Sequence, residues 1–203
     1  ISWKKSMKWS DHNLMWGRPL RSIFALFSGK KIAFQFDHLE SVDEIFIEQD
    51  LDSKSKKVKN FKDYNNLLRS NYIVLDHNER EKIILKKINS TSKLKDYKEI
   101  LNSKLLEEVV NIVEYPNVLL VNFNKEYLKI PQEIIISTLE KHQRYFPIFD
   151  NRERLTNNFF VVANKKDQKK FITIGNKRVV EARLADAKFF WDKDRSKNLI
   201  KQI

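Results

Sequence analysis

Apolar residues along the chain recur at helical spacing in some stretches and run continuously in others. In "SKLLEEVVNIVEY", residues 103–115, they gather on one side of a helical projection, which predicts an amphipathic helix. The run "NVLLVNF", residues 117–123, is typical of a buried strand. Farther on, "RYFPIFD" and "NNFFVVAN" flank the polar segment "NRERLT", which predicts a β-hairpin over residues 144–164.

Three more helices are predicted from periodicity and from residues that favour helix ends. One covers residues 77–90, with Asp76 as its N-cap. Another covers residues 130–143, with Pro131 near the first position, where a missing N–H group costs nothing. The third is a long helix over residues 175–199. Its apolar stripe consists of Val180, Leu184, Ala187 and Trp191.

The first part of the chain gives shorter signals. "RSIFALFSGKKIAFQF", residues 21–36, predicts two strands joined by a turn around Gly29. A short strand is expected around residues 45–47, followed by a solvated, lysine-rich loop over residues 52–59. The other elements predicted here are a helix over residues 64–70 and a strand over residues 72–75.

The irregular order of strands and helices predicts an α+β fold, with a mixed or antiparallel sheet and packed helices. We expect an α+β domain over residues 1–165 and a helical segment over residues 166–203 that leads into a further domain. The chain starts with Ile and carries a helical pattern almost to its last residue. It therefore reads as a piece of a longer protein.

Charge and composition narrow the classes of function. Thirty-nine Lys and Arg residues against 27 Asp and Glu residues give a formal net charge of +12, which favours a polyanionic partner. Lys, Asn and Ile are abundant throughout, so part of this charge reflects general composition. No apolar run approaches the roughly 18 residues of a membrane span, so no membrane partner is expected.

Several kinds of site are excluded or disfavoured. The chain has no cysteine, which rules out disulfides and thiolate metal sites and fits the cytoplasm. Its three glycines are too far apart for a phosphate-binding loop, so no ATP site or other cofactor site is expected. The four histidines, at positions 12, 38, 77 and 142, show no short ligand spacing, so no metal site is predicted.

The segment "EKHQRYFP", residues 140–147, concentrates histidine, basic and aromatic residues. Thr138 precedes His142 by one helical turn, but a threonine there usually bonds its own helix backbone. We therefore do not expect His142 to be a base, and we predict no catalytic residue. The aromatic residues that follow are expected to belong mostly to the core.

Basic residues near this segment and on the last predicted helix are candidate RNA contacts. Cations on rigid helices suit phosphate contacts that position RNA without reading its bases. On the last helix the cations alternate with Glu181 and Asp186, so internal ion pairs are an equal alternative. The predicted binding residues are Lys141, Arg144, Lys177, Arg178 and Arg183.

Several ungapped strings resemble one family. "HQRYFP", residues 142–147, and "RLADAKFF", residues 183–190, are similar to the β subunit of bacterial glycyl-tRNA synthetase of the two-chain type. "MKW", "RPL" and "ALFSG" in the first 30 residues also fit that family's pattern. The chain departs from it within residues 46–61, where the family carries a Gly-His-Arg-Phe-like string, and at Ser10, where a glycine is expected.

The resemblance implies a role in a glycine–tRNA ligase, which attaches glycine to tRNA(Gly) at the expense of ATP through a glycyl-adenylate. ATP and Mg²⁺ would be used on the α subunit, the partner in a heterotetramer. This chain would then be a noncatalytic tRNA-binding and scaffold portion. It would resemble the B3/B4 domain of the phenylalanyl-tRNA synthetase β chain, ending in a helix that leads to a helical domain. Two alternatives remain open, namely an editing-type hydrolase of mischarged tRNA in a B3/B4-like pocket and a pure subunit-assembly module.

Overall fold

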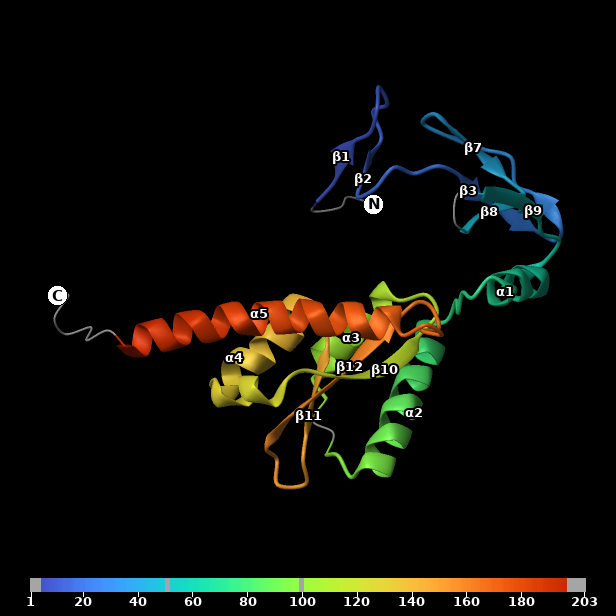
Figure 1. The fold of residues 1–203 in the computed structure, drawn as a ribbon. Coiled ribbons are helices and arrows are strands. Elements are labelled where there is room, and N and C mark those ends of the chain that lie inside the picture. Colours follow the sequence, from blue (N-terminus) through green and yellow to red (C-terminus); the bar gives the residue numbers. More distant parts are fainter. Residues whose placement is uncertain (1–4, 50–51, 99–100, 197–203) are drawn as a thin grey trace. The chain divides into compact units, whose positions relative to one another are not determined.

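The computed structural model describes residues 5–49, 52–98 and 101–196. The chain divides into two compact units, unit 1 over Ile1–Ile73 and unit 2 over Val74–Ile203 (Figure 1). Both units combine strands and helices, so the predicted α+β class is confirmed. The predicted boundary at residue 165 lies inside unit 2, because the last helix packs on the same core as the sheet before it.

Unit 1 consists of short strands followed by one helix. Its strands form four small sheets among the described residues, and in only one of these, β3-β7-β6, is a pair parallel. The elements are β1 (Met7–Lys8), β2 (Met15–Trp16), β3 (Ile23–Phe24), β4 (Leu26–Phe27), β5 (Lys30–Lys31), β6 (Gln35–Phe36), β7 (Leu39–Val42), β8 (Glu44–Gln49), β9 (Asp52–Lys57) and α1 (Phe61–Ser70).

The predicted turn around Gly29 is confirmed, since it joins the antiparallel strands β4 and β5. Gly29 has a φ of 77°, in the left-handed region that glycine adopts without strain. The strand expected around residues 45–47 lies within β8. Helix α1 starts earlier than predicted, because the Asn60 side chain accepts a hydrogen bond from the Asp63 N–H group at 2.9 Å and caps it there.

Two predictions in unit 1 and the segment after it are wrong. Residues 52–57 of the predicted lysine-rich loop form β9, which pairs antiparallel with β8. Ladder hydrogen bonds need no apolar side chain, and lysines are common on exposed edge strands. The segment 72–75 is not a strand, because Tyr72 turns the chain with a φ of 59° after α1.

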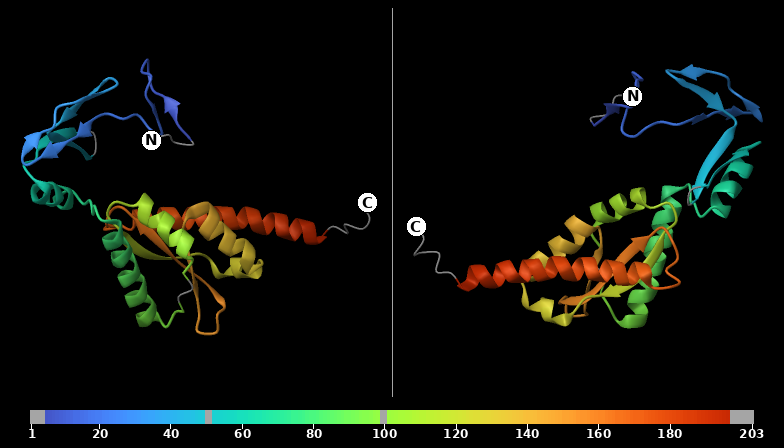
Figure 2. Two further views of the ribbon diagram at one scale, coloured as in Figure 1. Left: turned by 180° about the vertical axis from the view of Figure 1, so that it is seen from behind. Right: turned by 45° about the horizontal axis from the view of Figure 1, so that its top comes forward.

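Unit 2 is built on a three-stranded antiparallel sheet in the order β10-β12-β11. These strands are β10 (Asn117–Asn122), β11 (Phe146–Phe149) and β12 (Leu155–Ala163), and they confirm the predicted strand and hairpin. Helices surround the sheet (Figure 2). They are α2 (His77–Lys95), α3 (Ser103–Ile112), the 3₁₀ helix η1 (Lys125–Lys129), α4 (Gln132–Ser137), the π-helix η2 (Thr138–Gln143) and α5 (Phe171–Ser196).

Both faces of this sheet are buried, each under a different set of helices. Phe160 of β12 belongs to a cluster with Ile84 of α2 and Val109 of α3. Its neighbour Phe159, which points to the opposite face, belongs to a second cluster with Leu184 of α5. The continuous apolar runs in β10 and β12 follow from this burial, because successive side chains enter different cores.

Helix α5 lies along the second core. Val180 and Leu184 have no exposed surface, and Ala187 and Trp191 pack against the same cluster. The predicted apolar stripe is thereby confirmed. Figures 1 and 2 show the C-terminal half of α5 extending past the sheet. Among the described residues, no helix combines the length and apolarity needed to cross a bilayer.

Arg80 joins the first residues of unit 2, which precede α2, to the C-terminal end of α3. Its Nε donates to the Val110 carbonyl at 2.9 Å, near the C-terminal end of α3. Its Nη1 donates to the carbonyls of Val74 and Leu75 at 2.7 and 2.8 Å. The Val74 N–H group in turn donates to the Glu114 carbonyl at 2.8 Å. One guanidinium group therefore satisfies three carbonyls and fixes the segment before α2 against α3.

We expect Arg80→Ala to lower the free energy of unfolding of unit 2 by about 2 kcal/mol, because three carbonyls lose a charged donor. Lys82→Ala, on the exposed side of the same helix, should change it by less than about 0.5 kcal/mol. Urea unfolding of both variants provides the measurement. Equal stability of the two variants would contradict the role given to Arg80.

Candidate nucleic-acid interface

The segment that contains Lys141, His142 and Arg144 is a helix end. Helix α4 continues into the π-helix η2, and Arg144 terminates it with a φ of 60°. The N–H groups of Arg144 and Tyr145 both return to the Leu139 carbonyl. The predicted single helix over residues 130–143 is thus an α-helix with a π-helical last turn, and Pro131 is its N-cap residue.

Arg144 is used by the fold itself. Its Nε lies 2.6 Å from Glu108 Oε1 of α3, and its Nη1 donates to the carbonyls of Glu140 and Lys141. A cation at this position neutralises carbonyls that the helix end leaves without N–H partners. Because its Nε and Nη1 groups already donate within the fold, Arg144 is a poorer candidate for a phosphate contact. Lys141, in contrast, is exposed and makes no ion pair with the described residues.

His142 is exposed and its predicted lack of a catalytic role stays a prediction. Thr138 donates to the Ile134 carbonyl at 2.8 Å, as a helical threonine commonly does. The predicted core position of the aromatic residues is confirmed, since Tyr145, Phe146 and Phe149 are all buried.

Tyr145 connects this helix end to α5. Its ring stacks on Phe159 at 5.3 Å between centroids, and its hydroxyl donates to Asn176 Oδ1. Burial raises the pKa of the Tyr145 hydroxyl, and the nearby Arg183 guanidinium partly offsets that rise. Arg183 therefore lies on the flank of α5 that faces η2.

The three predicted cations of α5 point in different directions. Lys177 pairs with Glu181 at 3.8 Å, whereas the predicted pairs of Arg178 with Glu181 and Arg183 with Asp186 are not among the ion pairs of the described residues. Arg178 and Arg183 are exposed. They are five residues apart, so their side chains leave the helix about 140° apart. The five predicted residues therefore do not form one cluster.

A row of lysines on α2 was missed by the sequence interpretation. Lys82, Lys86 and Lys93 are four and seven residues apart, so they leave α2 within about 40° of one another. All three are exposed and make no ion pair with the described part of the chain. We call them the α2 lysine row. Their spacing of four and seven residues is the signal in the sequence, but the helix prediction rested on the apolar residues of the opposite side.

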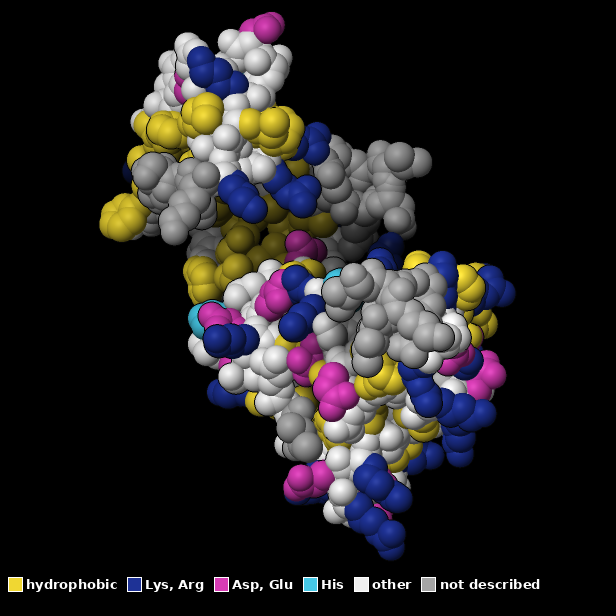
Figure 3. Space-filling model, turned by 90° about the vertical axis from the view of Figure 1, so that its left-hand side faces the viewer, with side chains coloured by type: hydrophobic (Ala, Val, Ile, Leu, Met, Phe, Trp, Pro, Cys, Tyr) yellow, Lys and Arg dark blue, Asp and Glu magenta, His cyan; other side chains and the backbone are white. Residues whose placement is uncertain are grey.

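The surface near η2 is electrically mixed, and the α2 lysine row is less so. The Glu108 carboxylate lies beside Arg144, and carboxylates oppose an incoming phosphate. On the face of the molecule drawn in Figure 3, Lys and Arg side chains also lie among Asp and Glu side chains. Glu79 and Glu81 lie before or beside Lys82, and Asp96 follows Lys93 by three residues, but no carboxylate lies within residues 82–95.

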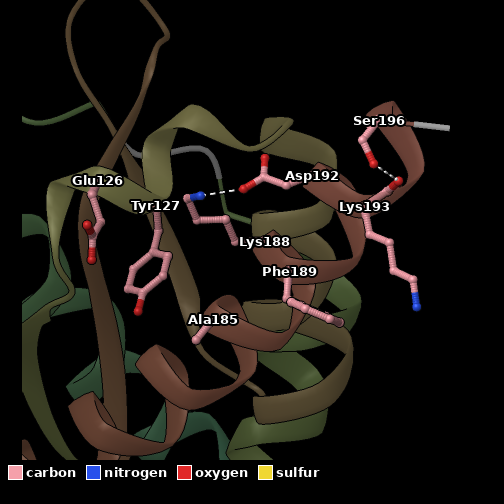
Figure 4. A pocket seen from close by; sticks show the side chains of 8 residues that line it. All are labelled: Glu126, Tyr127, Ala185, Lys188, Phe189, Asp192, Lys193 and Ser196. Carbon is pink, nitrogen blue, oxygen red and sulfur yellow. Dashed lines mark hydrogen bonds and ion pairs between the residues drawn. The ribbon is translucent and has the colours of Figure 1, made fainter.

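A pocket of about 530 Å³ lies between η1 and the end of α5 (Figure 4). Tyr127, Ala185 and Phe189 supply its apolar lining, and the carboxylate of Asp192 pairs with Lys188, four residues earlier on α5. This pairing raises the pKa of Lys188. Glu126 and Lys193 add two further charged groups to the lining, and the Ser196 hydroxyl donates to the Lys193 carbonyl at 2.7 Å. In unit 1, the side chains that could hold a metal ion are those of His12, Asp37 and His38.

We expect Arg144→Ala to destabilise unit 2 by about 1 kcal/mol, because the helix end and Glu108 lose their donor. Lys141→Ala should be neutral within about 0.5 kcal/mol. Arg144→Gly removes the same side chain but favours the positive φ, so it should be more stable than Arg144→Ala. Thermal unfolding measures all three variants. An Arg144→Ala variant as stable as the unaltered chain would refute a structural role.

Comparison with known proteins finds the β subunit of glycine–tRNA ligase. The chain is 37% identical to the glycine–tRNA ligase β subunit of Rickettsia canadensis over 199 residues, which is 98% of this chain and 30% of that protein. For the β subunit of Syntrophomonas wolfei the identity is 35% over 200 residues, 98% of this chain and 29% of the relative. For that of Rickettsia conorii it is 38% over 202 residues, with 98% and 30% covered.

The chain thus spans about 30% of the length of these curated relatives. A family model described as "Glycyl-tRNA synthetase beta subunit" matches residues 1–203, the full length of the sequence. The resemblance predicted from "HQRYFP" and "RLADAKFF" is confirmed, and the chain belongs to the glycyl-tRNA synthetase β-subunit family.

Proposed function

We propose that this chain is a noncatalytic, tRNA-binding and scaffold portion of the β subunit of a cytoplasmic glycine–tRNA ligase. The observation that carries the proposal is its family membership over the full sequence together with cations that its own fold leaves unpaired. The holoenzyme joins glycine to tRNA(Gly) with ATP and Mg²⁺, and the α subunit of a heterotetramer carries that chemistry. This chain contributes position and positive potential.

We place the RNA-facing surface at the exposed cations that make no ion pair with the described residues. Arg144 and Lys177 are excluded because Glu108 and Glu181 already pair with them. Lys141, Arg178 and Arg183 remain from the predicted set, and the α2 lysine row joins them. The row spans about 16 Å along a rigid helix, and its lysines release counterions when phosphates approach. It is therefore the strongest single contact surface in the proposal.

The B3/B4-like domain was predicted over residues 1–165, and within the proposal we now place it in unit 2. An antiparallel sheet covered by helices on both faces, followed by the long α5, is the arrangement expected of an α+β domain that leads into helices. The editing alternative needs a polar pocket that holds a water molecule for attack. In the pocket beside α5, Lys188 and Asp192 pair with each other, Glu126 accepts from the Asn124 amide, and the Ser196 hydroxyl donates to the Lys193 carbonyl. The noncatalytic role is therefore preferred in the proposal.

Salt dependence of tRNA binding tests the proposed function. The chain should bind tRNA with an affinity that falls steeply with salt, since each phosphate contact contributes close to one unit of log–log slope. Replacing Lys82, Lys86 and Lys93 by Ala should lower this slope by about 2 to 3 and weaken binding about tenfold or more at low salt. Filter binding at several salt concentrations gives both quantities.

The matched control replaces three exposed lysines of unit 1, Lys30, Lys31 and Lys62, by Ala. It removes the same charge and should reduce the slope by less than about 1. If the unaltered chain bound no tRNA, the proposed RNA-binding role would be wrong. Equal losses in the two triple variants would show that net charge, and not the α2 lysine row, governs binding.

Assembly with another chain is a second candidate function, favoured by the outer face of α5. This face lies opposite Val180 and Leu184, yet it is also largely apolar. Phe171 and Phe189 are 71% and 60% exposed there. A helix that is apolar on both sides is usually covered on both sides. The face recurs at steps of three and four residues through Phe171, Ile174, Arg178, Ala182, Ala185 and Phe189. A chain that covers this face would also cover Arg178 and so remove it from the RNA-facing set.

We propose that the α subunit contributes the covering surface. Phe171→Ser combined with Phe189→Ser should then weaken binding of the purified α subunit about tenfold or more, as loss of exposed aromatic anchors does. Phe27→Ser combined with Phe61→Ser, which are 73% and 71% exposed in unit 1, is the matched control. Analytical ultracentrifugation of the mixed chains provides the measurement. Unchanged association of the first variant rules this face out.

A further inference from the structure

Two hairpins of unit 1 meet at their tips. His12 lies in the connection between β1 and β2, and Asp37 with His38 forms the two-residue turn between β6 and β7. Figures 1 and 2 show these two tips near each other in each view. One potential ligand atom from each of the three side chains lies within 4.8 Å of the other two. The strands concerned belong to different sheets, so the side chains are brought together by the fold of the unit and not by one ladder.

The Asp37–His38 turn places two potential metal ligands side by side. Asp37 has a φ of 52°, and its Oδ2 lies 2.8 Å from His38 Nδ1. Two ligands of a tetrahedral zinc ion, with bonds of about 2.1 Å, are about 3.4 Å apart. An ion bound between the two atoms would therefore require them to move apart by about 0.6 Å. Imidazole nitrogen with carboxylate oxygen is also a ligand pair that Zn²⁺ accepts.

His12 supplies the third ligand from the other hairpin. Its ring stacks on that of His38 with 3.5 Å between centroids and 7° between planes. An ion bound in the plane of the His38 ring lies outside the parallel plane of the His12 ring, so His12 has to rotate about its side-chain bonds to bind. A pocket of about 130 Å³ beside both rings, lined by Trp9, Leu14 and Trp16 among others, gives room for this rotation.

Unit 1 also lacks a large apolar core that would fix these hairpins. The buried apolar side chains among its described residues are Leu39, Val58 and Leu68, whereas large side chains such as Phe34 and Phe36 are more than 40% exposed. Small folded units with little core commonly depend on a metal ion or another cross-link. A tie between the two hairpin tips would supply one.

We propose that His12, Asp37 and His38 form a binding site for a divalent transition metal ion, with Zn²⁺ as the best fit. The ion would join the β1–β2 hairpin to the β6–β7 turn and stabilise unit 1, with water in its remaining coordination positions. This departs from the prediction of no metal site, which considered only histidines close in sequence. The proposal is independent of tRNA binding.

Calorimetric titration of the chelator-treated, 203-residue chain with ZnCl₂ tests the site. We expect one Zn²⁺ ion per chain and a rise in the unfolding temperature of the zinc-loaded protein. His12→Ala and His38→Ala should each weaken Zn²⁺ binding about tenfold or more. His77→Ala and His142→Ala, which replace exposed histidines of unit 2, should change it less than about twofold.

A second measurement needs no variant and therefore does not depend on their folding. Carbethoxylation of the unaltered chain, followed by mass spectrometry, should show that Zn²⁺ protects His12 and His38 while His77 and His142 still react. Failure of the chain to bind Zn²⁺ would overturn the proposal. So would Zn²⁺ binding that survives His12→Ala, or equal reactivity of His12 and His38 with and without Zn²⁺.

Discussion

Burial of the β10-β12-β11 sheet on both of its faces is the constraint on which unit 2 depends. Neighbouring residues of the central strand, Phe159 and Phe160, have 0% and 2% of their surface exposed and belong to two separate cores. A shift of one residue in the register of β12 would exchange these two side chains between cores of different shape. The helices on each face are therefore held by the same alternation of side chains, and α5 takes its position from the core that contains Phe159.

Because the inner faces of the helices are committed to these cores, interactions with other molecules fall to their outer faces. There the arginines and lysines play different roles. Arg80 and Arg144 donate to main-chain carbonyls near helix ends and to Glu108, since a planar guanidinium group serves several acceptors at once. Lys82 and Lys86 have no such partner among the described residues, and a hydrated ammonium group remains free for a phosphate. Counting positive charges in the sequence does not separate these roles.

Patterns that depend on burial could be predicted from the sequence, and those that depend on distant partners could not. The strands of unit 2 follow from continuous apolar runs and the Val180–Leu184 stripe of α5 from helical spacing, because burial of their own side chains decides both. The strand β9 was missed because its partner β8, and not its own lysine-rich composition, makes it a strand. For the candidate site, Lys141 stayed exposed as expected, but the engagement of Arg144 by Glu108, 36 residues earlier, has no local signature.

The same reasoning explains why the histidines of unit 1 escaped a search by spacing. Metal ligands that lie close in sequence usually share one turn or one helix, whereas His12 and His38 occupy the tips of two hairpins that belong to separate sheets. The two hairpin tips meet through the imidazole rings of His12 and His38, whose centroids are 3.5 Å apart. The divalent ion proposed for this cluster would bind one atom from each hairpin tip, and coordination would then make the contact between the hairpins a stabilising one.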